Sequence, residues 1–133
     1  MTKLVLDTSA YSHFRRGEGA AVSLISAASW IGVSAVVLGE LRAGFGLGKR
    51  RAHNEGELSE FLASSVVYLL DVDDEASRIY AEIVAALRAA GTPVPTNDIW
   101  IAAVAAREGV RVVTYDAHFR LIERVGTHVL SAT

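Results

Sequence analysis

The sequence predicts an α/β fold built around a mainly parallel sheet of four to five strands. Short apolar runs rich in valine, isoleucine and aromatic residues alternate with longer segments of helical periodicity. Parallel neighbours in a sheet need crossover connections, and helices between the strands supply them. A length of 133 residues fits one compact domain, and no repeat, low-complexity tract or linker divides it. We therefore expect a single domain over residues 1–133.

Four apolar runs indicate buried strands, at residues 3–6, 30–33, 66–70 and 111–114. Strands covered on both faces carry near-continuous apolar residues, and these runs fit that pattern. A weaker run at residues 127–130 is expected to complete the sheet.

The clearest helix follows the third of these strands. Its apolar positions recur at i, i+3, i+4, i+7, i+8 and i+11, and they are Ala76, Ile79, Tyr80, Ile83, Val84 and Leu87. Gly91 is expected to end this helix. Two more helices are predicted over residues 34–44 and 50–63, with residues 44–48 as the turn between them. A fourth is expected to begin with Thr96 as its N-cap and to end at Gly109.

Composition excludes several classes of protein. The chain has no cysteine, which excludes disulfide scaffolds, thiolate zinc sites and cysteine nucleophiles and is compatible with the reducing cytoplasm. No apolar run approaches the length of a membrane-spanning helix, so no membrane association is expected. The hydrophobic fraction of 51% is high for a small monomer, which suggests that a partner covers part of the surface.

Two carboxylates follow predicted strands at the edge where ligands bind in open α/β sheets. Asp7 comes directly after residues 3–6, and Asp116 lies two residues beyond Thr114. Each also has a structural alternative. Asp7 could cap the helix that starts at Thr8, and Asp116 could be a turn residue ahead of a short helix at residues 117–122.

Two further carboxylates lie on predicted helices. Glu40 has apolar or small helical neighbours and no basic residue one turn away, so burial without a function would be costly. Solvent exposure of its carboxylate by snorkelling is the equal alternative. Asp98 lies in the first turn of its helix, where interaction with the helix dipole would explain it alone.

Taken together, these four carboxylates could converge on one point. Carboxylates in close proximity repel one another unless cations lie between them. Hard oxygen ligands select Mg²⁺ or Mn²⁺, and such a site suits phosphodiester hydrolysis. The formal net charge of −2 does not exclude a nucleic-acid substrate, because bound cations would neutralise these acids.

The segments around the four acids resemble the motifs of a known family. They are Leu-Val-Leu-Asp-Thr-Ser around Asp7, Gly-Glu-Leu-Arg-Ala-Gly around Glu40, Thr-Asn-Asp-Ile-Trp-Ile-Ala-Ala around Asp98 and Thr-Tyr-Asp-Ala-His-Phe around Asp116. Their order and approximate gaps are similar to those of PIN domains of the VapC toxin family, over essentially the whole chain. The resemblance implies a three-layer α/β/α fold and an endoribonuclease dependent on Mg²⁺, with Mn²⁺ as a substitute.

The resemblance also assigns roles. It implies that Asp7, Glu40, Asp98 and Asp116 form the catalytic, metal-binding pocket, with Ser9, Thr114 and Asn97 as supporting polar residues. It further implies a toxin that cleaves cellular RNA and inhibits translation, held inactive by a cognate antitoxin protein. Such toxins commonly form homodimers and higher toxin-antitoxin assemblies.

Basic residues near the predicted pocket are candidates for RNA contacts. Arg15, Arg16 and Arg42 follow Asp7 and Glu40 in the chain and could reach RNA phosphates. Simple solvation of these side chains is the competing explanation. The histidines, including His118, share no metal-ligand spacing, and we expect them on the surface.

Two other functions require residues that the sequence lacks. A haloacid-dehalogenase-type phosphatase needs a second aspartate where Ser9 stands, and a receiver domain needs a late lysine that does not fit here. The serious alternative is a non-catalytic PIN-like module that binds RNA or protein and uses the acids only for structure.

Overall fold

The computed structural model describes residues 2–132. Five strands form one sheet in the order β3-β2-β1-β4-β5, and every neighbouring pair is parallel. The strands are β1 (Lys3–Leu6), β2 (Trp30–Ser34), β3 (Val67–Leu70), β4 (Val112–Thr114) and β5 (Thr127–Val129). The predicted parallel sheet is confirmed.

The central strand is β1, and its apolar residues are buried because both faces are covered. Leu4, Val5 and Leu6 are all at most 3% exposed. Leu6 is in register with Val33 of β2 and with Val113 of β4. The residues that follow these positions, Asp7 among them, therefore emerge at one edge of the sheet.

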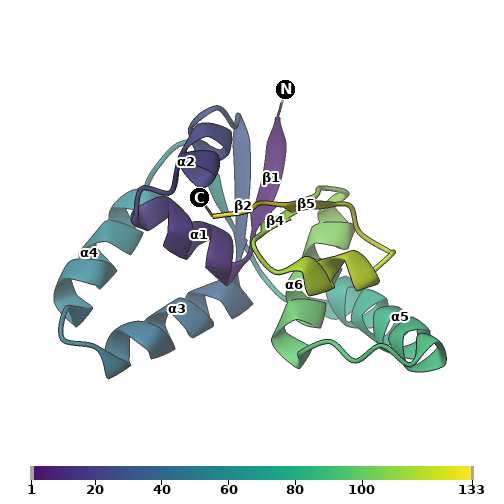
Figure 1. Cartoon of the computed structure of the whole chain (residues 1–133). Coiled ribbons are helices and arrows are strands. Elements are labelled where there is room, and N and C mark those ends of the chain that lie inside the picture. The colour runs from purple at the N-terminus through teal and green to yellow at the C-terminus, as the bar shows by residue number, and fades with distance from the viewer. Residues whose placement is uncertain (1, 133) are drawn as a thin grey trace.

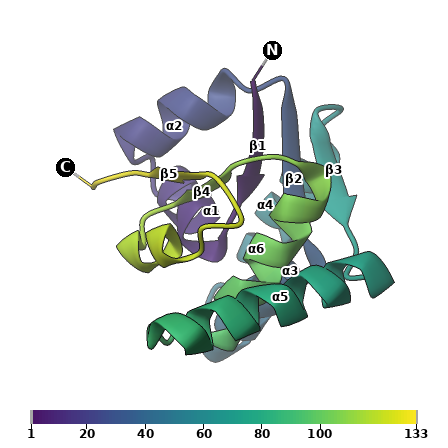
Figure 2. The same ribbon diagram turned by 90° about the vertical axis from the view of Figure 1, so that its right-hand side faces the viewer.

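Helices cover both faces of the sheet. Figure 1 shows α1 to α4 on one side of the strands and α5 and α6 on the other, which is the three-layer α/β/α arrangement. In Figure 2, α5 lies across α6. The helices are α1 (Thr8–Arg15), α2 (Gly19–Ser26), α3 (Ala35–Leu47), α4 (Arg51–Leu62), α5 (Asp74–Ala90) and α6 (Thr96–Glu108), with a 3-10 helix η1 (Ala117–Leu121) before β5.

Glycines end α5 and α6 as the sequence predicts. Gly91 and Gly109 take φ angles of 69° and 68°, in the left-handed region that glycine adopts without steric cost. Asp73 caps the start of α5, where its side chain accepts a hydrogen bond from the backbone of Ala76. The ends of these helices are therefore set by local sequence.

Three local predictions were wrong or incomplete. Helix α3 continues through Gly44 to Leu47, because Phe45 packs against the core and compensates for the weak helical preference of glycine. Thr96 is not an N-cap: it is already the first residue of α6, and Pro95 occupies the cap position without a side-chain hydrogen bond. The short helix α2 was not predicted.

No helix within residues 2–132 is both long enough and apolar enough to cross a membrane.

Candidate active site

Asp7 links the end of β1 to the start of α1. Its side chain is buried, with 2% of its surface exposed. Oδ1 accepts a hydrogen bond from the backbone N–H of Ala10 at 2.8 Å, so the residue is the N-cap of α1. The capping role considered from the sequence is therefore real. It fixes the carboxylate at the carboxyl edge of the sheet without excluding a second role there.

Two hydroxyl groups hold the same carboxylate. Ser9 Oγ donates to Asp7 Oδ1 at 2.8 Å, and Thr114 Oγ1 donates to Oδ2 at 2.5 Å. The hydroxyls are themselves anchored, since Ser9 Oγ accepts from the backbone of Tyr115 and Thr114 Oγ1 accepts from the backbone of Asp116. The supporting positions expected from the sequence thus contact Asp7 from α1 and from β4.

Burial disfavours the ionised form of Asp7. Desolvation raises the pKa of Asp7 to about 6, although hydrogen bonds from Thr114, Ala10 and Ser9 favour the charged form. The nearby negative charge of Asp116 raises this pKa further. A positive charge placed beside the carboxylate would reverse these effects.

Glu40 projects from α3 toward α1 and α6. It is half-buried, and its two oxygens are held by different helices. Thr8 Oγ1 donates to Oε1 at 2.6 Å, and Asn97 Nδ2 donates to Oε2 at 3.3 Å. The carboxylate is therefore held by donors from α1 and α6, and its contact with Asn97 is open to solvent.

Asp98 lies in the first turn of α6, with a side chain that is 16% exposed. Its Oδ2 is 2.6 Å from Nε2 of His118. Burial is the main cause that raises the pKa of Asp98, and the charges of Glu40 and Asp116 add to it, while His118 acts in the opposite direction. The carboxylates that act on Asp98 of α6 therefore come from α3 and from the turn after β4.

Asp116 is the most open of the four. It is exposed, it precedes η1, and its carboxylate does not cap that helix. Its charge nevertheless acts on both Asp7 and Asp98. We refer to Asp7, Glu40, Asp98 and Asp116 together as the acidic cluster.

The acidic cluster has no built-in cation of fixed charge. Within residues 2–132, no lysine or arginine forms an ion pair with any of its members, and His118 is the basic side chain in contact with it. In the same part of the chain, no three histidine or acidic side chains stand where they could together hold a metal ion. The carboxylate oxygens suit a hard divalent cation by their chemistry, but three of the four carboxylates are held by protein donors.

Comparison with known proteins identifies the family. The family model of the PIN domain matches residues 4–125. The chain belongs to the PIN domain family. The match includes all four members of the acidic cluster.

Two relatives of this PIN domain are VapC ribonucleases. It is 32% identical to ribonuclease VapC5 of Mycobacterium tuberculosis over 119 residues, which covers 90% of this chain and 87% of that protein. It is 39% identical to ribonuclease VapC4 of the same organism over 85 residues, or 64% of this chain. That second match spans 65% of VapC4, just under two thirds of its length.

Solved structures agree with this assignment. VapBC-5 from Mycobacterium tuberculosis, a member of the VapBC family of toxin-antitoxin systems, contains a chain that is 30% identical, with a TM-score of 0.74 and coverage of 99% and 100% of the two chains. A chain of VapBC2 from Rickettsia felis, bound to a promoter DNA fragment, has a TM-score of 0.87 at 22% identity and covers 98% of this chain and 100% of its own. The second likeness shows the shared fold.

The arginines that were candidates for RNA contacts have partners elsewhere in this PIN domain. Arg42 Nε donates to Glu55 of α4 at 2.8 Å, and Arg15 Nη2 donates to the backbone oxygen of Glu57 at 3.0 Å. Arg16 lies 3.5 Å from His13 Nδ1. No contact joins the three arginines to the acidic cluster within the described residues, so an RNA role for them remains a prediction.

Sequence reasoning missed two residues of the site. Thr8 binds Glu40, and His118 binds Asp98, although we expected His118 on the surface without a role. The position of His118 two residues after Asp116 was the available signal. A residue so near one acid in the chain is well placed to reach another that folds beside it.

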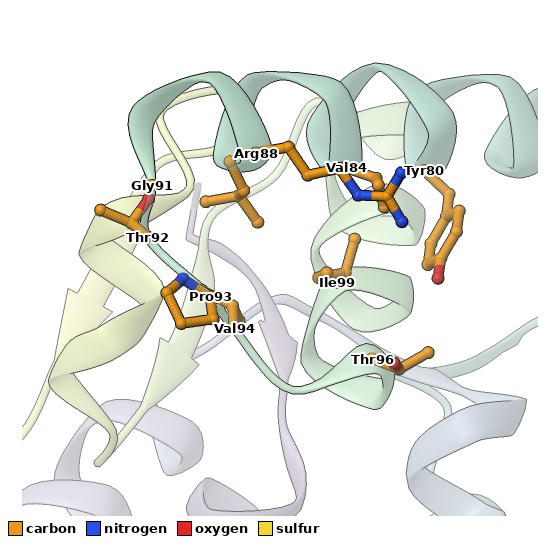
Figure 3. A pocket seen from close by; sticks show the side chains of 10 residues that line it. Tyr80, Val84, Arg88, Gly91, Thr92, Pro93, Val94, Thr96 and Ile99 are labelled. Carbon is orange, nitrogen blue, oxygen red and sulfur yellow. The ribbon is translucent and has the colours of Figure 1, made fainter.

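A pocket of about 440 Å³ lies between α5 and the start of α6 (Figure 3). It is lined mainly by apolar side chains, with Arg88 and Tyr80 on one side. The pocket includes Thr96 and Ile99, which flank Asp98 in the chain, but no member of the acidic cluster lines it. It adjoins the helix that carries Asp98 and is not the site of the acids.

Proposed function

We propose that this PIN domain is a Mg²⁺-dependent endoribonuclease, with Mn²⁺ as a substitute, and the toxin of a toxin-antitoxin pair. In this role it would cleave cellular RNA in the cytoplasm and inhibit translation. The observation that carries the proposal is that hydrogen bonds bring the acid-bearing segments together: Asn97, next to Asp98, binds Glu40, and Thr114 binds both Asp7 and the backbone of Asp116. Among the described residues, no lysine or arginine forms an ion pair with these four acids. A divalent cation is the partner that this charge distribution lacks.

The chain's own residues would orient the reacting groups. Bound Mg²⁺ would polarise the phosphodiester and lower the pKa of an attacking water. Asp7 is held in one orientation by Ser9, Thr114 and the backbone of Ala10. Asp116 is exposed, so its carboxylate oxygens can accept a hydrogen bond from that water. In the reaction the water oxygen bonds to phosphorus, a P–O ester bond breaks, and the leaving oxygen takes a proton.

Two protein partners are proposed, from the relatives of this chain and from its exposed apolar side chains. VapBC-5 is a toxin-antitoxin system, and we extend an antitoxin partner to this chain. A hydrophobic fraction of 51% and exposed apolar side chains support covered surfaces, and they include Leu47, Leu69 and Leu121. We propose a cognate antitoxin and a homodimer, within a higher toxin-antitoxin assembly.

A non-catalytic PIN module that binds RNA or protein is the second candidate. One observation favours it: no three side chains of the acidic cluster are already arranged to hold a metal ion, within residues 2–132. On our proposal, side-chain rotation completes the ligand set when the cation binds. Calorimetry with Mn²⁺ separates the two functions, because a binding module has no reason to take up the ion through these acids.

The function is tested by incubating total cellular RNA with the purified chain and Mg²⁺ or Mn²⁺. Samples with EDTA and with the Asp98→Asn variant accompany the wild type. Asp74→Asn is the matched control, because Asp74 also lies in the first turn of a helix but pairs with Arg78 on the surface. We expect discrete fragments from the wild type and from Asp74→Asn, and a rate at least about 100-fold lower for Asp98→Asn. Intact RNA with a folded, metal-loaded, antitoxin-free wild type would favour the binding module.

A further inference from the structure

His118 is the one histidine that touches the acidic cluster within residues 2–132. Its Nε2 lies 2.6 Å from Oδ2 of Asp98, across a separation of 20 residues in the chain. The side chain of His118 is 33% exposed and that of Asp98 is 16% exposed. The contact therefore joins η1 to α6 in a partly desolvated setting, where a hydrogen bond to a carboxylate is stronger than on the open surface.

The backbone around His118 is fixed by its neighbours. Phe119 is fully buried, and its ring stacks on the His118 ring with centroids 5.3 Å apart. The backbone N–H of Phe119 donates to Asp116 O at 3.2 Å, and the N–H of Asp116 donates to Thr114 Oγ1. One short turn thus carries both Asp116 and His118, which binds Asp98. The same turn is connected to Asp7 through Thr114.

Only one oxygen of Asp98 is used in this contact. Within the described residues, His118 binds Oδ2 and no hydrogen bond to Oδ1 is formed. A carboxylate held through one oxygen has its plane and its rotamer constrained, while the other oxygen stays available. The remaining oxygen is the one that can coordinate a cation or a water.

We propose that His118 is a positioning residue that holds Asp98 through Oδ2 and leaves Oδ1 for the divalent cation. The role rests on the proposed function and adds to it a residue outside the acidic cluster. By the same contact, His118 connects α6 to the turn that carries Asp116. The positions of Asp98 and Asp116 relative to each other are thereby fixed. His118 acts through Asp98 and does not need to touch the RNA.

A second histidine–carboxylate pair in the chain shows what an ordinary surface contact looks like. His53 Nε2 lies 3.3 Å from Glu57 Oε1 on the same helix, four residues away, with side chains that are 52% and 36% exposed. That pair joins no separate elements and is open to solvent on both sides. His53→Ala is therefore the matched control for a histidine variant.

The test measures Mn²⁺ affinity by calorimetry and the Mn²⁺ spectrum by electron paramagnetic resonance, with RNA cleavage as a separate readout. Three variants are compared with the wild type: His118→Ala, His118→Gln and His53→Ala. We expect His118→Ala to weaken Mn²⁺ binding by about 10- to 100-fold and to lower kcat while KM for RNA stays near the wild-type value. His118→Gln places an amide donor near the position of Nε2 and should restore most of the affinity. His53→Ala should bind Mn²⁺ as the wild type does.

The outcomes separate this role from the proposed function. Equal Mn²⁺ affinity in His118→Ala and wild type would overturn the positioning role, and so would a failure of His118→Gln to improve on alanine when both are folded by circular dichroism. A wild type that binds Mn²⁺ but cuts no RNA would overturn the proposed function. The positioning role would then be decided by the Mn²⁺ affinities of the His118 variants alone. A wild type that binds no Mn²⁺ would overturn both.

Discussion

The molecule contains two groups of acids, one paired with an arginine and the other without a lysine or arginine partner among the described residues. One is the acidic cluster at the carboxyl edge of the sheet. The other is the Arg107 clamp, in which Arg107 of α6 contacts Asp71, Asp73 and Glu108. Arg107 Nη1 donates to Asp73 Oδ1 at 2.9 Å and to the backbone oxygen of Asp71 at 2.8 Å.

The two groups differ in the direction of their pKa shifts. In the clamp, the hydrogen bond from the backbone of Ala76 and the Arg107 guanidinium lower the pKa of Asp73. In the acidic cluster, burial and like charges raise the pKa values of Asp7 and Asp98. An acid that has a permanent cation beside it stabilises the contact between helices, here between the start of α5 and the end of α6. Asp7, which is held by hydroxyl and backbone donors, keeps its need for a cation, which a ligand can meet.

The largest expected effect concerns Asp7 without metal. Its folded-state pKa of about 6 lies above its ordinary value of 3.8, so the folded protein binds this proton more tightly than the unfolded chain does. In EDTA, this group therefore stabilises the fold at low pH and loses that contribution as pH rises from about 4 through about 6, by up to roughly 3 kcal/mol. Urea unfolding across this range, compared with Asp7→Asn, isolates the effect; parallel curves for the two proteins would contradict it.

A slightly smaller effect is expected from adding a cation. At a Mn²⁺ concentration about 100 times the dissociation constant, binding to the folded state should raise its stability by about 2.7 kcal/mol. Asp98→Asn should lose this gain, whereas Asp73→Asn should keep it because Asp73 belongs to the Arg107 clamp. Thermal unfolding with and without Mn²⁺ measures both. Equal stabilisation by Mn²⁺ in the two variants would contradict the assignment of the cation to the acidic cluster.

Breaking the clamp should affect stability and leave the site intact. The side chain of Arg107 is 8% exposed, and Arg107→Met removes its hydrogen bonds to Asp71 and Asp73. We expect a loss of about 1–2 kcal/mol in the free energy of unfolding. Mn²⁺ affinity of the folded variant, measured by calorimetry, should not change. A large loss of affinity would mean that the clamp also orients the acidic cluster.

The smallest stability effect is expected at Arg42. Its ion pair with Glu55 is exposed, with side chains that are 48% and 36% accessible, so Arg42→Ala should change stability by no more than about 0.5 kcal/mol. If Arg42 contacts RNA phosphate, the dependence of RNA affinity on salt should weaken by about one counterion. Filter binding over a range of salt concentrations decides this, and an unchanged slope would assign Arg42 to the α3–α4 contact alone.

Much of the fold could be predicted because its signals are local. The runs at residues 3–6 and 30–33 are apolar except for the exposed Lys3, since parallel strands are covered on both faces, and they became β1 and β2. Gly91 and Gly109 mark helix ends through their own backbone freedom. Where packing decides, local signals failed: the glycines near residue 44 predict a turn, but contacts of Phe45 with the core keep α3 helical.

The sequence singled out the four carboxylates of the acidic cluster, whose catalytic role stays a prediction, but not the contacts that hold them. Strand ends and a polar residue on an apolar helix face indicated Asp7, Asp116 and Glu40 from the sequence. The donors that hold them come from distant positions: Thr114 reaches Asp7 across 107 residues, and Asn97 reaches Glu40 across 57. No periodicity records such pairs, because they depend on how separate elements pack.

By itself, the sequence determined the α/β class, the parallel sheet and which carboxylates stand at its edge, because apolar periodicity and strand ends act over a few residues. Tertiary structure alone decided how those carboxylates are held: that Asp7 is buried under Ser9 and Thr114, that His118 faces Asp98, and that Arg107 neutralises the other acids. Burial and electrostatic interaction depend on neighbours in space, and the fold brings those neighbours from every part of the chain.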